Sequence, residues 1–157
     1  MYYPMDEVFE VTLSLDTNVY ADGDVLADTQ EIANVFTVPG KCVILNSIFL
    51  LDKDDQGGAL DLVFMRNATS LGTENAALNI SDLNAGEIIG IVPIAAADYH
   101  DFINSQIVVK GPSDEGMGYI LQPNALGGTS AWIGAISRDT KTYSASGILL
   151  KIGLLRS

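Results

Sequence analysis

An acidic segment at residues 52–58, DKDDQGG, offers the densest set of oxygen ligands in the chain. Asp52, Asp54 and Gln56 fall at positions 1, 3 and 5 of an EF-hand calcium loop, which binds through carboxylate and carbonyl oxygens. Position 12 of that loop needs a bidentate glutamate, and here it is Val63. The residues on both sides have the pattern of strands, whereas an EF-hand needs helices. The spacing therefore excludes an EF-hand.

Two groups of carboxylates leave an irregular calcium site open as an alternative. They are Asp52, Asp54 and Asp55, and Asp16, Asp22 and Asp24. The simpler interpretation of the segment at residues 52–58 is a solvated turn, whose charges prevent unwanted pairing with other strands. We adopt this interpretation and predict no metal site.

Histidine and cysteine, which serve in much acid–base and nucleophilic chemistry, occur once each. His100 is followed by Asp101, which on a strand would point to the opposite face, and no Gly-x-Ser-x-Gly motif supplies a nucleophile. Cys42 lies in an apolar run and is predicted to be a small buried side chain. One cysteine and one histidine cannot form a structural zinc site. We predict no catalytic residue, no cofactor and no enzymatic activity.

A set of aromatic residues suggests a different function, the stacking of a sugar ring, as in lectins built on a β-sandwich. The set consists of Tyr99, Tyr119, Trp132 and Tyr143. Aromatic residues spread over several strands more often belong to the core and its rim. A sugar- or receptor-binding module therefore remains the alternative function.

The charge balance limits the possible partners. The chain of 157 residues has a net charge of −12, with 8 basic and 20 acidic residues. Nucleic acids and anionic membranes attract clustered Lys and Arg, so we predict that the chain binds neither. Charged residues make up only 18% of the chain, against about 25% in an average soluble protein. A neutral surface of this extent suits contact with other copies or with a partner protein.

The first residues, MYYPMD, have neither the basic start nor the apolar stretch of a secretory signal peptide. No apolar run approaches the roughly 20 residues that cross a bilayer. We therefore expect synthesis in a cytoplasm. Residues 1–6 form a predicted N-terminal arm, whose Tyr2, Tyr3, Pro4 and Met5 are the candidate partner contacts. The alternative is a disordered or loosely docked terminus.

The elements that would position these residues are strands. Apolar and polar residues alternate over residues 7–16, with Phe9, Val11, Leu13 and Leu15 on one face. This pattern is typical of an antiparallel sheet with one face exposed to solvent. Further strands are expected at residues 29–38, 42–51, 59–65, 88–94, 102–110, 119–122, 131–137 and 147–155. The runs at 42–51 and 59–65, with the acidic segment between them, predict a central β-hairpin.

The only predicted helix is a single turn at residues 81–86, SDLNAG, with Ser81 as its N-cap. Eight or nine short strands with almost no helix predict an all-β fold, an antiparallel β-sandwich of the jelly-roll type. No linker divides the chain, so residues 7–157 are expected to form one domain.

Several segments together carry a resemblance to a known group of proteins. They are LDT at 15–17 with YADGDVLAD at 20–28, LDKDDQGGALDLVF at 51–64, ISDLNAG at 80–86, IGIVPI at 89–94, AISRDT at 135–140, and TYSAS at 142–146 before LLKIG at 149–153. In these segments the chain resembles small structural proteins of tailed bacteriophages and prophages. The likeness spans residues 8–155 and is weakest at residues 104–128.

This resemblance implies a virion protein that resides on the capsid surface as a decoration or cement protein. It implies binding to the major capsid protein between capsomers, and self-association, with a homotrimer favoured. It carries no active-site residues. Within the same group, the alternative function becomes a sugar- or receptor-binding module of a head or tail fibre.

Overall fold

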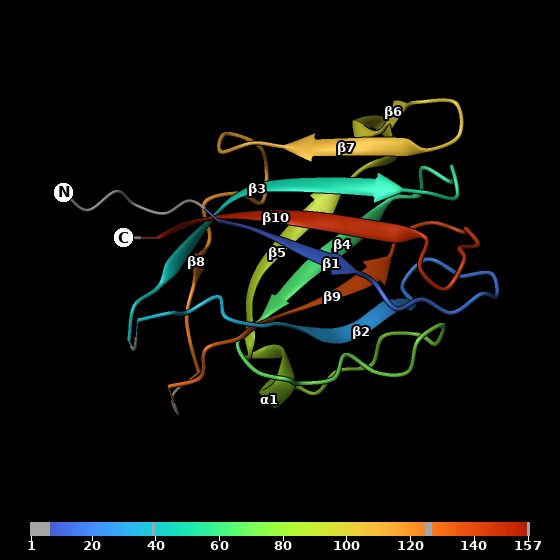
Figure 1. Ribbon diagram of the computed structural model, residues 1–157. Helices are drawn as coiled ribbons and strands as arrows, with labels where there is room; N and C mark the ends of the chain where they lie inside the picture. The colour runs from blue at the N-terminus through green and yellow to red at the C-terminus, as the bar shows by residue number, and fades with distance from the viewer. Residues whose placement is uncertain (1–6, 39, 125–126, 157) are drawn as a thin grey trace.

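The computed structural model describes residues 7–38, 40–124 and 127–156, which form two antiparallel β-sheets packed face to face (Figure 1). The larger sheet contains, in spatial order, β1 (Glu7–Thr12), β10 (Ile148–Arg156), β3 (Val43–Asp52), β7 (Gln106–Lys110) and β6 (His100–Asp101), and β8 (Ile120–Leu121) pairs with the first part of β3. The smaller sheet contains β2 (Val25–Ile32), β9 (Ala131–Ser137), β4 (Leu60–Met65) and β5 (Ile88–Ile94).

The order of the strands confirms the predicted jelly roll. Without the two-residue strands β6 and β8, the larger sheet runs β1-β10-β3-β7 and the smaller sheet runs β2-β9-β4-β5. Every pair of neighbours is antiparallel. Consecutive strands such as β1 and β2, or β3 and β4, belong to opposite sheets. This alternation of two four-stranded sheets is the jelly-roll arrangement.

The main core lies between the sheets and follows from strand alternation. On β4, Leu60, Leu62 and Phe64 are buried against the other sheet, whereas Val63 and Met65 point away from it. Leu150 and Ile152 of the larger sheet belong to the same core.

A second, smaller core covers the outer face of the smaller sheet. The segment that follows β4 crosses this face and buries Leu71 against Val63 and Met65. Asp28 of β2 anchors the segment, because its carboxylate accepts a hydrogen bond from the Leu71 backbone N–H at 2.7 Å. A Cβ at Gly134 would lie 2.5 Å from the Leu71 Cδ1, so a larger residue there would displace the Leu71 side chain. The smaller sheet is thus covered on both faces by its own chain.

The predicted central hairpin is wrong. β3 pairs with β10, β7 and β8, whereas β4 pairs with β5 and β9 in the other sheet. The residues between them, 53–59, cross from one sheet to the other. Two adjacent strands of a hairpin are usually joined by two to five residues. The longer acidic connection spans the distance between the layers, and it forms a corner of the sandwich.

Other predictions are confirmed or need smaller corrections. β5 and β9 have the predicted bounds, and α1 (Asp82–Ala85) is the predicted helical turn, with the Ser81 side chain accepting from the Asn84 N–H. β1 ends at Thr12 rather than at residue 16, β2 spans Val25–Ile32 rather than residues 29–38, and β7 begins at Gln106 rather than at residue 102. The described residues form ten strands rather than eight or nine, and they include a 3-10 turn that was not predicted.

No helix in the described part of the chain has the length and apolar character needed to cross a membrane.

Candidate functional site

The acidic corner between β3 and β4 is a structural element built around one buried carboxylate. Asp52 is 0% exposed, although Lys53 and Asp55 in the same segment are exposed. Its Oδ1 accepts the Asp54 N–H at 3.0 Å, and its Oδ2 accepts the N–H groups of Gln56 at 2.8 Å and Gly57 at 2.7 Å. Burial raises the pKa of Asp52, and the three backbone donors act in the opposite direction. The sequence interpretation of Asp52 as a solvated charge is therefore wrong.

Other residues attach this corner to the rest of the sandwich. The Asp54 carboxylate accepts hydrogen bonds from the Ser144 N–H at 2.7 Å and from the Ser144 hydroxyl. The Tyr99 hydroxyl donates to the Gly58 carbonyl at 2.8 Å. Burial raises the pKa of Tyr99 above its ordinary value, and it does the same for Tyr143. The hydrogen bonds of these polar atoms thus hold the turn in place.

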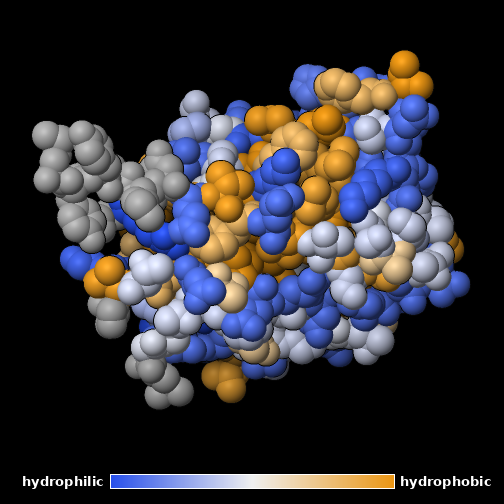
Figure 2. Space-filling view, viewed as in Figure 1, coloured by the Kyte–Doolittle hydropathy of each residue, from blue (hydrophilic) through white to orange (hydrophobic). Residues whose placement is uncertain are grey.

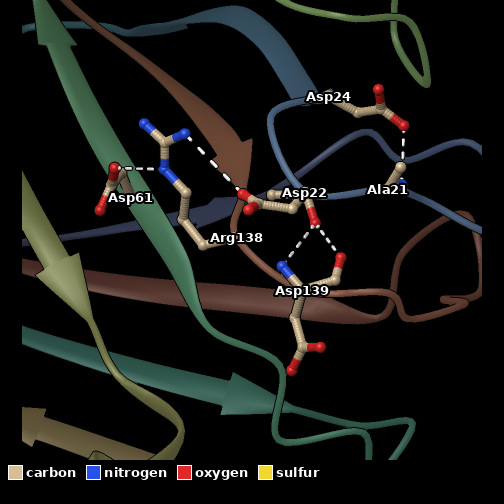
Figure 3. Close-up of polar contacts among 7 residues, drawn as sticks. Ala21, Asp22, Asp24, Asp61, Arg138 and Asp139 are labelled. Atoms are coloured by element: carbon tan, nitrogen blue, oxygen red, sulfur yellow. Dashed lines mark hydrogen bonds and ion pairs between the residues drawn. The ribbon is translucent and has the colours of Figure 1, made fainter.

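The second acidic group is divided among separate contacts (Figure 3). Asp24 accepts the Ala21 N–H at 2.7 Å and so closes its own turn. The Arg138 guanidinium lies between Asp61, at 2.8 Å, and Asp22, at 4.0 Å. A positive side chain therefore lies between Asp22, a member of this group, and Asp61, which is not.

Asp16 closes another turn. Its Oδ1 accepts the Asn18 N–H at 2.6 Å, and this bond contributes most to lowering the pKa of Asp16. A further bond comes from the Asn75 side chain at 3.1 Å. Within the described ranges, no three side chains of His, Cys, Asp or Glu are placed to hold a metal ion.

The histidine and the cysteine lie at separate places in the fold. His100 and Asp101 are both exposed on the short edge strand β6. Cys42 directly precedes β3 and is half-buried, so the prediction of a fully buried side chain needs correction. Its position at the rim of a surface pocket, described below, explains this exposure.

The structure does not gather the four aromatic residues into one platform. Tyr99 and Tyr143 lie near Gly58, at the start of β4, and Tyr143 is buried. Trp132 pairs with Met65 at the other end of β4 and packs into the second core. These residues therefore form no common surface on which a sugar ring could stack.

A partly buried ion pair links the 3-10 turn at Ala96–Asp98 to β7. The Lys110 Nζ lies 2.8 Å from the Asp98 Oδ2, and the two side chains are 10% and 33% exposed. The hydrogen bond from Lys110 is the main reason why the pKa of Asp98 is lowered. A carboxylate with a lowered pKa stabilises the fold above its unfolded-state pKa, and this contribution disappears as the pH falls through the folded-state pKa.

We expect Asp98→Asn to destabilise the protein by about 1–2 kcal/mol at pH 7, because Lys110 would remain charged and largely buried. The difference from the wild type should shrink at pH 3, below the ordinary aspartate pKa of 3.8, because Asp98 then takes up a proton more readily in the unfolded chain than in the folded one. Urea denaturation at both pH values measures it. Glu115→Gln, at an exposed residue, is the control. An equal difference at both pH values would contradict the assignment.

The outer surface of the larger sheet is the candidate interaction surface, here called the open face. In the view of Figure 2, apolar side chains gather over β3, β7 and β10. Its apolar members are Val8, Ile44, Phe49, Leu51, Ile107, Val109, Ile120, Leu149 and Leu155. Composition predicted a neutral surface, but its position follows only from the strand order.

Only Glu10 and Lys151 carry charge among the outward residues of β1, β10, β3 and β7. They are opposite each other in neighbouring strands, and the Lys151 Nζ lies 5.2 Å from the centre of the Phe49 ring. Val109 follows in the same row and is 64% exposed. The open face is therefore apolar and almost neutral in a chain of net charge −12.

At one end of the open face lies a shallow pocket of about 270 Å³, here called the corner pocket. It is lined by Cys42, Ile44, Ile120, Leu155 and Arg156, and the lining is mainly apolar. Pockets for drug-sized molecules usually measure about 300–1,000 Å³. The size of the corner pocket suits one or two side chains. The predicted contact residues Tyr2, Tyr3, Pro4 and Met5 lie outside the described residues.

Comparisons with known proteins show no family for the chain. No protein-family model matches the chain. No curated protein matches it either. Among solved structures, the chain is similar to one titled "Structure of a marine algae virus of the order Picornavirales", with a TM-score of 0.30 and 9% identity, over 96% of this chain and 67% of the other. The jelly-roll assignment depends on the strand order and needs no support from this likeness.

Proposed function

We propose that the chain is a structural protein of a bacteriophage virion, a decoration protein that binds the outer shell between capsomers. The observation that carries the proposal is the open face. One sheet is covered on its outer side by the chain itself, whereas the other presents a wide apolar surface to solvent. An exposed apolar surface of this kind marks a site of protein contact.

Two further observations support a role in assembly. Jelly rolls occur in capsid proteins and lectins, although the fold alone does not determine function. The sequence segments quoted above resemble small structural proteins of tailed phages. The acidic remainder of the surface would complement basic patches on a shell, and such complementarity guides association.

The most direct test is the binding of purified chain to shells assembled from the major capsid protein of the same virus. We expect Val109→Asp to weaken co-sedimentation at least tenfold, because an unpaired charge would be buried at the centre of the contact. Val19→Asp is a matched control, since Val19 is 58% exposed and lies outside the open face. Equal binding of the two variants would remove the open face from the proposal.

The arm provides a second prediction. Deleting residues 1–6 should leave the domain folded, because every described strand begins at Glu7 or later, and should weaken binding to the shell or between copies. Circular dichroism checks the fold, and quantitative electron cryo-microscopy of virions measures occupancy. Unchanged occupancy would exclude the arm from these contacts. Detection of the protein at the tail tip would refute the decoration role.

A further inference from the structure

We propose that the corner pocket binds the N-terminal arm, residues 1–6 of the same chain, through the aromatic side chains of Tyr2 and Tyr3. The inference concerns the free subunit and does not depend on the virion role. It assigns an occupant to the corner pocket.

The side chains of the arm match the lining of the corner pocket in chemistry. The corner pocket is lined by three aliphatic side chains, Ile44, Ile120 and Leu155, with Cys42 at the rim and Arg156 beside them. Ile44 and Ile120 are exposed in the described chain. The arm, MYYPMD, contains two tyrosines and two methionines among six residues. Tyrosine and methionine are side chains that fill irregular apolar surfaces well.

The position of the first strand brings the arm to this site. Glu7 begins β1 and is opposite Leu154, so the arm departs next to Leu155. Leu155 is opposite Ile44, and Ile44 is opposite Ile120, on successive strands across the sheet. With about 4.8 Å between strands, the far side of the corner pocket lies about 14 Å from the line of β1.

The arm is long enough to reach across. An extended chain covers at most about 3.5 Å per residue, so Tyr3 can lie up to roughly 14 Å from Glu7 and Tyr2 somewhat farther. A segment tethered this closely has an effective concentration in the millimolar range at its site. At micromolar protein concentration, the arm of the same chain therefore outcompetes the arm of another copy.

The single cysteine at the rim of the corner pocket allows a direct test. Tyr3→Cys in the full chain places a second thiol in the arm, and a disulfide requires the two Cα atoms to come within about 7 Å. Under mild oxidation at micromolar concentration, we expect most of the variant to form an internal disulfide. Non-reducing electrophoresis and intact mass detect it as a compact monomer that is lighter by two hydrogens.

Two control variants measure how much disulfide forms without binding of the arm. Tyr3→Cys with Cys42→Ser cannot form the internal bond. Ser146→Cys, in an otherwise unchanged chain, places an exposed thiol beside the end of β10 that pairs with Asp52, far from Cys42 at the other end of β3. Internal bonding no faster than in the Ser146→Cys variant would overturn the proposal. A disulfide that forms mainly between chains would also overturn it, because the occupant would then be a second copy.

A second measurement needs no new cysteine, so its result does not depend on how Tyr3→Cys alters the arm. Ile44→Asp and deletion of residues 1–6 should each shift the midpoint of urea denaturation, and together they should shift it by less than the sum, since both remove the same contact. Fully additive shifts would contradict binding of the arm at Ile44.

Discussion

Replacing Asp52 with alanine is expected to lower the free energy of unfolding by about 3 kcal/mol, because three backbone N–H groups at the corner lose their acceptor at once. The donors belong to Asp54, Gln56 and Gly57, and the chain must satisfy all three as it crosses between the sheets. Guanidinium denaturation at pH 7 measures the loss. Asp52→Asn should cost less, since its amide oxygen can still accept one or two of these bonds.

Asp55→Asn is the matched control for this prediction. Asp55 is exposed and has a φ of 55°, a conformation that asparagine adopts readily. We expect its free energy of unfolding to stay within about 0.5 kcal/mol of the wild type, as for most surface substitutions. If Asp52→Ala were as mild as this control, the buried carboxylate would not be what holds the corner.

Replacing Gly116 with alanine should destabilise the protein by about 3 kcal/mol, the sum of a left-handed backbone and an occupied space. Gly116 has a φ of +81°, which disfavours any side chain. An added Cβ would lie 2.8 Å from the Val92 Cα and 3.0 Å from the Ile91 carbonyl oxygen. Both atoms belong to the backbone of β5, the outermost strand of the smaller sheet, so neither can easily move.

Gly118→Ala separates the two causes. Gly118 has almost the same φ, +82°, but nothing lies within 4 Å of its added Cβ. Its variant should therefore lose only the conformational part, about 1 kcal/mol. Urea denaturation of both variants measures the difference. Equal losses would show that the loop does not pack closely on β5.

The pattern of apolar residues predicted most of the strands and the jelly-roll class, because burial on one or both faces of a sheet leaves a clear periodicity. The start of β2 was missed for a specific reason. Asp28 lies inside this strand, where a charged residue suggests a loop. Its carboxylate anchors the covering segment at Leu71, through a contact between residues 43 positions apart that no local pattern reveals.

The corner and the open face could not be predicted for a related reason. The apolar runs around the acidic segment have the same periodicity whether they pair with each other or with strands elsewhere in the chain. The partner strands, β9 and β10, are about 70 to 100 residues away in the sequence. The choice of partner also decides which outward residues become neighbours, so the surface made by Phe49, Val109 and Leu149 has no local signature.

The pairing of β1 with β10 has a consequence for how the protein is made. Of the described strands, β1 leaves the ribosome first, yet its partner β10 is the last of them to be synthesised, and β10 also lies between β1 and β3. Folds with such distant pairings form slowly, since long loops must close first. The larger sheet therefore cannot be completed in the nascent chain before residue 156 has emerged. Until then, its apolar strands are candidates for chaperone binding.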